Sequence, residues 1–452
     1  MKTLFDEKEV LSPHPDFVLD EKSGEIFLAH ASGRKVRTDR LGKIIWETFP
    51  GTAAEVEARV RREWNISRGL VRLFLYLLRR AGAVRSSQEL RDVPAPPAEA
   101  GVPAGDTASV IVITRNGEEH IRGCLESLAA QTRAPLEVLV VDNASTDRTA
   151  EIIRDSFPGV RVLSMKKNIY FPGAVNRGLA EARGRFLMVL NDDTELEGDC
   201  LRRLCLRMER EPRAGAIAPL MKFYHLRGFI NGLGNHVRGR GWGSDNFIGC
   251  VDVGQFAGLA EVASACFGAV MLRREAVRDV GGLDPAYVAY YEDIDWSIRC
   301  RLRGWTVVPE AGAVVYHKFG AFWKTQARKQ AHVVRNRLRL VLKLFEGKTR
   351  GSFLRAYVKE DIRGFLSYLG RKEFGLAAVY PMAYLTLLAG LPRVLLERGE
   401  ILKKKAPGSC VEAVLDKNPE FFSGLDESLA PRLDAAVVFE YYRWELARFS
   451  SP

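Results

Sequence analysis

The chain has 452 residues and a formal net charge of +11, and 47% of its residues are hydrophobic and 27% charged. This composition excludes a disordered or fibrous protein, and the length predicts two or three domains. The seven cysteines are odd in number and form no C-x-x-C pair, which argues against a disulfide framework and a structural zinc site.

The first 85 residues predict a small α+β domain. Two short strands over 16–19 and 25–29 form a hairpin, and segments of helical periodicity follow. Thr52-Ala-Ala-Glu55 has the capping-box pattern of a helix start. This order of elements resembles the PqqD-like family, small winged-helix domains that hold peptides in ribosomal-peptide modification systems. The opening residues contain no apolar run of secretory length, so we expect a cytoplasmic protein.

Residues 86–107 are rich in Pro, Ala, Gly and Ser and predict a linker. After it, apolar strands alternate with amphipathic helices, which predicts an α/β domain over 108–323 with a mostly parallel sheet and helices on both faces. The expected strands cover 109–114, 137–142, 160–164 and 185–191, and the expected helices lie near 118–130, 149–157 and 173–183. In such sheets ligands bind at the carboxyl ends of the strands.

Polar side chains follow three of these strands where each one ends. The first strand ends in Thr114-Arg-Asn116, the second at Asp142 and the fourth in Asn191-Asp-Asp193. Asp142 can accept a hydrogen bond from a base or ribose, although a strand-end aspartate equally often forms a turn. Adjacent carboxylates repel unless a cation lies beside them, and Mg²⁺ or Mn²⁺ prefers such oxygens together with substrate phosphates. Asp192 and Asp193 therefore predict a divalent metal site.

Residues 109 to about 320 resemble the inverting family 2 glycosyltransferases of the GT-A fold, a Rossmann-like α/β architecture, and especially their rhamnosyltransferase-like branch. Eight segments in order carry the resemblance: 109–116, 141–147, 168–178, 190–195, 265–275, 280–284, 291–296 and 317–320. The resemblance implies transfer of a sugar from a nucleotide-diphosphate sugar to an acceptor hydroxyl with inversion at the sugar carbon.

The resemblance also implies roles for particular residues. Those implied to contact the nucleotide are Thr114, Asn116, Asp142, Asn168, Asn191 and Asp192. Asp193 and His317 are implied to bind Mg²⁺ or Mn²⁺. Glu292 and Asp293 lie where the family keeps its acceptor-side acidic pair, and Asp293 is the expected general base. Asp295 is the rival for that role, but a short helix would turn it away from Asp293.

Two segments near this site leave alternatives open. The family motif H-x-x-G-x-S is His317-Lys-Phe-Gly-Ala-Phe322 here, so the terminal serine and its implied acceptor-loop role are absent. Residues 223–250 fit either an acceptor loop or a surface excursion.

Residues 324–452 predict a basic helical region. Positions 324–405 hold 19 Lys or Arg and 6 Asp or Glu, a net charge of +13 that suits an anionic membrane surface, a polyanionic acceptor or a solvated helical face. Residues 333–344 have the pattern of an interfacial helix, with basic residues on one face and Val or Leu on another. The apolar run 374–392 predicts a monotopic or core-packed element rather than a true membrane span.

Three functions compete on these observations. The first is a glycosyltransferase that acts at the inner membrane face on a glycan or glycolipid acceptor, as in polysaccharide biosynthesis. The second keeps this chemistry but transfers the sugar to a peptide held by residues 1–85, since mycofactocin glycosyltransferases join a similar small domain to this catalytic fold. The third is a winged-helix protein that binds nucleic acid through its basic surface. The strand-end carboxylates argue against the third, because they would repel a polyanion.

Overall fold

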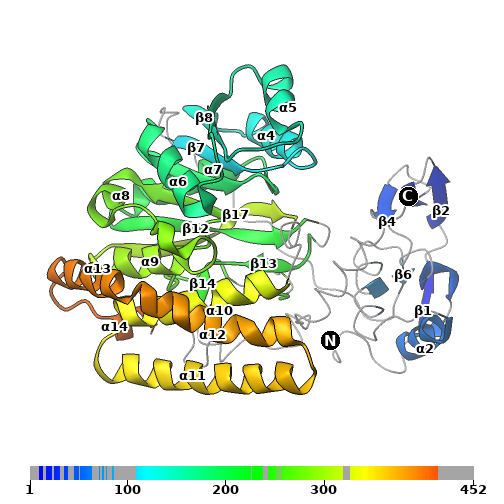
Figure 1. The fold of residues 1–452 in the computed structure, drawn as a ribbon. Coiled ribbons are helices and arrows are strands. Elements are labelled where there is room, and N and C mark those ends of the chain that lie inside the picture. The colour runs from blue at the N-terminus through cyan, green and yellow to red at the C-terminus, as the bar shows by residue number, and fades with distance from the viewer. Residues whose placement is uncertain are drawn as a thin grey trace. The chain divides into compact units, whose positions relative to one another are not determined.

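The computed structural model describes residues 108–415, except 225–226, 238–242, 251, 253, 255 and 319–325. In the first 107 residues it describes 10–13, 17–22, 25–30, 35–38, 45–49, 51–63, 71, 74–75, 78 and 84–85. The predicted linker over 86–107 and the stretch 416–452 lie outside this described part. The chain forms two compact units, one of residues 1–95, 249–254 and 423–452 and the other of 96–248 and 255–422 (Figure 1).

The N-terminal unit contains two small antiparallel sheets, ordered β2-β3-β4 and β5-β1-β6. Their strands are β1 (Val10–Pro13), β2 (Phe17–Lys22), β3 (Glu25–His30), β4 (Lys35–Thr38), β5 (Gly51–Thr52) and β6 (Val84–Arg85). The predicted hairpin is confirmed, because β2 and β3 pair antiparallel with Lys22 opposite Glu25.

Helix α2 (Ala53–Glu63) begins at the predicted capping box. The Thr52 backbone N–H donates to the Glu55 carboxylate at 2.7 Å, and the Glu55 N–H donates to the Thr52 hydroxyl at 3.3 Å. The two bonds satisfy backbone donors that a helix start leaves without partners. The other helical segments predicted before residue 85 lie largely outside the described residues, so the PqqD-like resemblance stays a prediction.

The larger unit is built on a nine-stranded sheet of order β11-β17-β12-β16-β10-β7-β8-β9, with β13 added beside β12. Its strands are β7 (Ala108–Thr114), β8 (Glu137–Asp142), β9 (Arg161–Ser164), β10 (Phe186–Asn191), β11 (Thr194–Leu196), β12 (Ala214–Phe223), β13 (Ile230–Gly232), β16 (Ala269–Arg273) and β17 (Thr306–His317). β10, β7, β8 and β9 run parallel, as the alternating pattern predicts. The other half is mixed, because β16 runs antiparallel to both β10 and β12.

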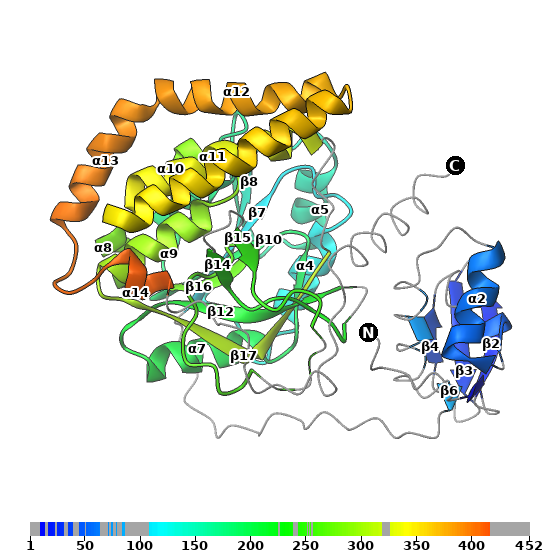
Figure 2. The same cartoon turned by 90° about the horizontal axis from the view of Figure 1, so that it is seen from below.

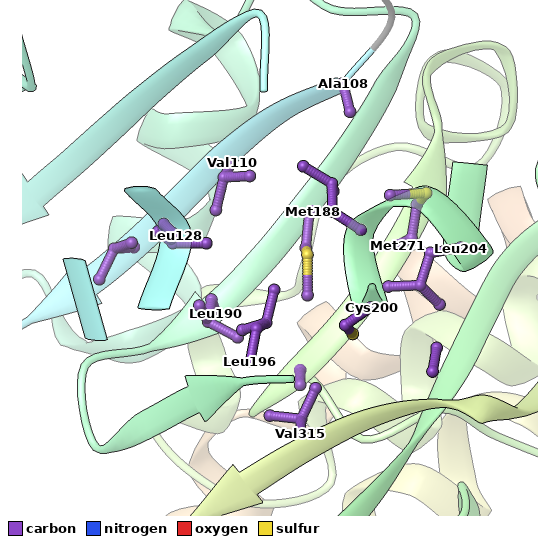
Figure 3. Packing of buried hydrophobic residues seen from close by; sticks show 14 of the residues in the cluster. Ala108, Val110, Leu128, Met188, Leu190, Leu196, Cys200, Leu204, Met271 and Val315 are labelled. Atoms are coloured by element: carbon purple, nitrogen blue, oxygen red, sulfur yellow. The ribbon is translucent and has the colours of Figure 1, made fainter. Parts of the chain in front are cut away.

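Helices cover both faces of this sheet, which confirms the expected α/β class. Side chains alternate between faces along each strand, so Val110 and Val112 of β7 pack on one layer and Ile111 and Ile113 on the other. The first layer holds α4 (Ile121–Ala129), α5 (Thr149–Ser156) and α7 (Cys200–Arg210). Figure 3 shows part of its core, with Leu128 and Leu204 against Met188 and Leu190. The second layer holds α6 (Tyr170–Glu181), α8 (Arg274–Val280) and α9 (Glu292–Leu302).

Shorter elements complete the region around the strand ends. They are η1 (Pro285–Tyr287), β14 (Asn235–Val237) and β15 (Gly243–Asp245), the last two forming an antiparallel pair. β14 and β15 lie in the segment whose role the sequence leaves open.

The C-terminal helices belong to the same compact unit as the sheet and lie beside and below α9 in the view of Figure 1. They are α10 (Gln326–Leu344), α11 (Gly347–Gly370), α12 (Phe374–Ala389), α13 (Leu391–Lys403) and α14 (Val411–Leu415). Among the described residues no single helix is long and apolar enough to cross a membrane. Taken together, α12 and α13 have the required length and apolar composition, but they meet at a bend of 59°.

The expectation that residues 333–344 form an interfacial helix is wrong. In α10 the apolar face and the basic face are both buried, and Arg337, Arg339 and Lys343 are at most 5% exposed. Arg337 pairs with Asp361 of α11, while Lys343 pairs with Asp284 at 2.9 Å. Arg337, Arg339 and Lys343 therefore form internal ion pairs, which an amphipathic sequence pattern does not distinguish from a charged surface.

Candidate functional site

The end of β10 places the two predicted acids beside the end of β7. The Thr114 hydroxyl donates to Asp192 Oδ2 at 2.5 Å. Gly117 makes this contact possible, since a Cβ there would lie 2.1 Å from the same Asp192 oxygen and 2.6 Å from Thr114 Oγ1. Burial and the neighbouring charge of Asp193 raise the pKa of Asp192 to about 7. Thr114 thus fixes the carboxylate that is expected to face the nucleotide.

Asp193 is brought to His317 by strand pairing. β11 follows Asp193 directly and pairs antiparallel with β17, with Thr194 opposite His317. Asp193 Oδ2 lies 3.5 Å from His317 Nε2. Burial alone would raise the pKa of Asp193, but the charge and hydrogen bond of His317 bring it below its ordinary value. The opposite balance holds at His317, where Asp193 outweighs burial and raises the pKa of the imidazole.

Two features of this pair are suited to a divalent cation. Asp193 Oδ1 is buried and has no hydrogen-bond partner among the described residues. His317 Nδ1 lies 2.7 Å from Asn231 Oδ1, and Asn231 is held nearby because β13 pairs with β12, the neighbour of β17. A donating Nδ1–H orients the ring and leaves Nε2 as the metal-binding nitrogen, a common arrangement for histidine ligands.

One carboxylate and one imidazole fit Mn²⁺ or Mg²⁺ with phosphate oxygens and water as further ligands. In the described part of the chain no cluster of three or more His, Cys, Asp or Glu side chains is arranged to hold a metal.

The loops after β7, β8 and β9 are tied together by the predicted nucleotide residues. The Asn116 side-chain oxygen accepts from the Thr146 N–H at 2.8 Å, and Asp142 Oδ1 accepts from the Ser145 N–H at 2.9 Å. Asn168 accepts from the Asn143 amide at 3.0 Å. Asp142 therefore shapes a turn with one oxygen, and a contact of the other with the nucleoside stays a prediction.

Asn191, the remaining predicted nucleotide residue, is half-buried at the end of β10. Its N–H donates to the Gly268 carbonyl at 2.9 Å, and its own carbonyl accepts from the Thr194 hydroxyl at 2.6 Å. These bonds hold the turn that presents Asp192 and Asp193.

The predicted acidic pair lies in the first turn of α9. Asp293 is half-buried, and its Oδ2 accepts from the Asn235 amide at 2.7 Å. Burial raises the pKa of Asp293 to about 7, and burial with the charge of Asp293 raises the pKa of Glu292 to about 8. Glu292 is buried, and its Oε2 has no hydrogen-bond partner among the described residues. A carboxylate titrating near neutrality has the proton affinity that a general base needs.

Asp295, the rival of Asp293, is committed to structural contacts. Its Oδ1 accepts from the Tyr287 hydroxyl at 3.1 Å and lies 2.8 Å from Lys343 Nζ, while its Oδ2 accepts from Arg299 at 2.7 Å. These cations outweigh burial and lower the pKa of Asp295. Asp295 is fully buried, so Asp293 is the better candidate for proton transfer.

Sequence reasoning missed three polar residues of the segment 223–250. Asn231 contacts His317 and Asn235 contacts Asp293, so this segment joins the two halves of the site rather than forming a surface excursion alone. Asp245, paired with Asn235 across β14 and β15, adds a third charge. Burial raises the pKa of Asp245 to about 6, and its charge acts on both Asp293 and His317. The polar residues near Gly232 and Gly234 were the only sequence signal.

Comparison with known proteins finds similarities over the centre of this unit. Residues 109–281 match the model of Glycosyl transferase family 2. An N-acetylglucosaminyl-diphospho-decaprenol L-rhamnosyltransferase of Mycobacterium tuberculosis is 28% identical over 235 residues, which are 47% of this chain and 76% of that protein. A poly-beta-1,6-N-acetyl-D-glucosamine synthase of Staphylococcus epidermidis is 23% identical over 232 residues, and the match spans about half of each chain, 49% and 53%.

Two solved structures are similar at lower identity. GalNAc-T7 with UDP, GalNAc and Mn²⁺ is 14% identical with a TM-score of 0.43, over 54% of this chain and 49% of that one. A mannosyltransferase from Pyrobaculum calidifontis in complex with GDP-Man and Mn²⁺ is 16% identical with a TM-score of 0.41, over 83% of this chain and 97% of that one. These scores are too low to assign the fold, which follows from the sheet described above.

Proposed function

We propose, on the premise that residues 109–281 are a family 2 glycosyltransferase domain, that this protein is a metal-dependent inverting glycosyltransferase. The observation that carries the proposal is the pairing of Asp193 with His317 at the strand ends, with a buried Asp193 oxygen that lacks a partner among the described residues. The mixed, mostly parallel sheet fits the expected GT-A fold.

The proposed donor is a nucleotide-diphosphate sugar at the ends of β7, β8 and β10. Thr114, Asn116, Asp142, Asn168, Asn191 and Asp192 would contact its nucleotide part. Asp193 and His317 would hold Mg²⁺ or Mn²⁺, and such a cation neutralises negative charge that develops on the leaving diphosphate. Asn231 would keep the His317 ring in the orientation that this requires.

Asp293 would take the proton from the acceptor hydroxyl as the new glycosidic bond forms. Its pKa near neutrality lets it be ionised before reaction and still accept a proton, which contributes about 10²- to 10⁴-fold in rate. Asn235 would orient the Asp293 carboxylate through its hydrogen bond to Oδ2. One base opposite one leaving group gives a single displacement, and hence inversion at the sugar carbon. The charge of Asp245 adds to the effect of burial on Asp293, and Glu292 would be the second carboxyl group of the acidic pair.

The proposed acceptor is a glycan or glycolipid at the inner face of the cell membrane, as in polysaccharide biosynthesis. Support comes from the names of the mycobacterial and staphylococcal relatives, which denote rhamnose transfer to a sugar on decaprenol diphosphate and synthesis of a polysaccharide. Rhamnose is the favoured sugar because the rhamnosyltransferase is among these relatives. A peptide held by a PqqD-like N-terminal unit is the alternative acceptor. Binding of nucleic acid has no support in the site, which presents carboxylates.

The test of the proposal is Asp193→Ala. We expect it to lower sugar transfer by more than about 100-fold, because several kcal/mol of transition-state stabilisation depend on the cation. It should also abolish the rise in melting temperature that Mn²⁺ with a nucleotide sugar produces in the wild type. The matched control is Asp155→Ala on α5, where the aspartate side chain is 58% exposed.

The proposal is wrong if Asp193→Ala transfers sugar at the wild-type rate after chelation of divalent metals. It is equally wrong if no nucleotide sugar in a broad set raises the melting temperature of the wild type with Mn²⁺.

A further inference from the structure

Ten large apolar side chains on α11, α12 and α13 are exposed to solvent. They are Val358, Ile362, Leu366 and Leu369 on α11, Phe374, Met382, Leu385 and Leu388 on α12, and Leu395 and Leu396 on α13. Elsewhere in the described residues only Val18, Leu136 and Tyr170 are exposed among large apolar side chains. We name these ten residues the C-terminal apolar face. Soluble proteins rarely expose so many apolar side chains together, and such a patch usually marks an interaction site.

Helix α12 shows that this face is not explained by packing within the unit. Its inner side buries Ala377, Tyr380, Ala383 and Leu387 against α10 and α11. Its outer side carries no charge, because the whole helix Phe374–Ala389 lacks Asp, Glu, Lys and Arg. A surface helix in water ordinarily has charged or polar residues on its outer side. The outer side of α12 is therefore suited to an apolar neighbour.

Exposed cations neighbour the C-terminal apolar face along the chain, with the exposed Glu373 among them and Arg393 paired with Glu397. They are Arg355, Lys359 and Arg363 on α11, Arg371 and Lys372 in the turn before α12, and Arg393 on α13. Arg355, Lys359 and Arg363 flank Val358 and Ile362 in one shallow groove. Figure 2 shows α11, α12 and α13 together on the outside of the unit. Apolar side chains bordered by Lys and Arg complement a bilayer surface, where acyl chains lie beneath anionic headgroups.

We propose that the C-terminal apolar face docks on the surface of a bilayer that contains anionic lipids. A second copy of this chain is the less suitable occupant, because two such faces would bring their cationic rims together. The helix that was expected at the interface, α10, is not part of the docking surface, since its cations are buried in ion pairs.

The docking surface is connected to the proposed site by α10. Gln330 donates to the Tyr380 hydroxyl of α12 at 3.2 Å. One residue earlier, the charge of Asp245 acts on Lys329, as it does on Asp293 and His317. A bilayer at α12 would therefore bring a lipid-linked acceptor close to the site. This last step rests on the proposed function, whereas the docking itself does not.

The test is co-sedimentation of the full chain with vesicles of phosphatidylglycerol and phosphatidylethanolamine, compared with vesicles of phosphatidylcholine alone. We expect binding to the anionic vesicles that weakens as salt is raised. Leu385→Glu with Leu388→Glu should lower the affinity by at least about tenfold, because charges replace two exposed leucines that docking would bury in the bilayer. Arg371→Glu with Lys372→Glu should lower it by about fivefold or more for each cation. The matched control, Leu136→Glu, changes an exposed leucine outside the face and should bind as the wild type does.

Three results would overturn the proposal. The first is a wild type that sediments no better with anionic vesicles than without them. The second is full vesicle binding by the Leu385→Glu, Leu388→Glu variant. The third is a dimer, seen in analytical ultracentrifugation, that this variant dissociates while vesicle binding is unchanged, which would assign the face to a second copy.

The same variants separate this proposal from the proposed function. Leu385→Glu with Leu388→Glu should keep sugar transfer to a water-soluble acceptor, and Asp193→Ala should keep vesicle binding. Loss of transfer in the first variant would show that the face serves the catalytic unit rather than a bilayer.

Discussion

Two aspartates of α9 that lie two residues apart have opposite chemistry because of their partners. The cations of Lys343 and Arg299 contact Asp295 and lower its pKa. Among the described residues, the side chain that bonds to Asp293 is the neutral amide of Asn235, and burial raises the pKa of Asp293. Asp295 therefore stays ionised within its ion pairs, whereas Asp293 can exchange a proton near neutral pH.

The acceptor-side base can be tested by pH dependence. Since Asp293 must be ionised to act, we expect kcat/KM to rise as pH rises through about 7. Asp293→Asn should lower kcat by about 10²- to 10⁴-fold and remove this rise. Asn235→Ala removes a donor that stabilises the charged carboxylate, so it should move the rise to higher pH while leaving transfer measurable at alkaline pH. An unchanged pH profile in Asn235→Ala would refute the role of Asn235 in holding the base.

Gly117 is the residue on which the contact between Thr114 and Asp192 depends. Gly117→Ala places a methyl group against both side chains, so we expect a loss of about 1 to 3 kcal/mol in stability and weaker donor binding. The measurements are urea unfolding and the shift in melting temperature with a nucleotide sugar. Gly159→Ala is the control, since a Cβ there meets no atom within 4 Å. Equal behaviour of the two variants would show that the strand ends accommodate the methyl group.

Part of the site was predictable because its residues follow recognisable strands. Thr114, Asp142 and the pair Asp192 and Asp193 each come directly after an apolar run, and parallel strands bring such ends together. The contacts of Asn231 and Asn235 were not predictable, because they join residues 86 and 58 positions apart, which no local pattern reveals.

At the scale of elements, local patterns predicted the parallel half of the sheet and failed at α10. β7, β8, β9 and β10 combine apolar runs with regular spacing, so their positions agree with prediction to within a residue or two. The antiparallel position of β16 depends on long-range pairing. In α10 the basic residues recur at the same spacing whether they face water or distant carboxylates. Only the fold shows that their carboxylate partners lie at the start of η1 and on α9, α11 and α13.

The junction between η1, α9, α10 and α13 is a buried ion network that should control acid stability. Asp284 contacts Arg339 at 2.6 Å and Lys343 at 2.9 Å, and these cations outweigh burial and hold its pKa well below the usual range. A carboxyl group with a lowered folded-state pKa stabilises the fold above its unfolded pKa of about 4, and this contribution is lost as pH falls below that value.

Asp284→Asn should therefore lower the free energy of unfolding by about 3 to 5 kcal/mol at pH 7, because it leaves buried cations without their partner. The difference from the wild type should shrink as pH falls below about 4. Urea unfolding at a series of pH values measures both effects. A variant as stable as the wild type at pH 7 would show that Asp295 and Glu397 alone satisfy Arg339 and Lys343.

At the scale of the whole molecule, the unit that holds the candidate site is larger than the segment that matches the family model. Residues 109–281 contain Asp192 and Asp193 but end before α9, β17 and α10. Asp293 and His317 lie beyond that segment. The sheet, the acidic pair and the C-terminal helices all belong to one compact unit.

The ion network has a consequence for how this protein can be divided. Lys343 of α10 pairs with Asp284 and Asp295, which lie nine residues before and two residues after Asp293. A change that displaced α10 would break both ion pairs at once and loosen the start of α9, the helix that carries the proposed base. We therefore expect removal of the C-terminal helices to disturb the proposed base as well as the proposed docking surface, so a fragment that keeps the proposed activity should include them.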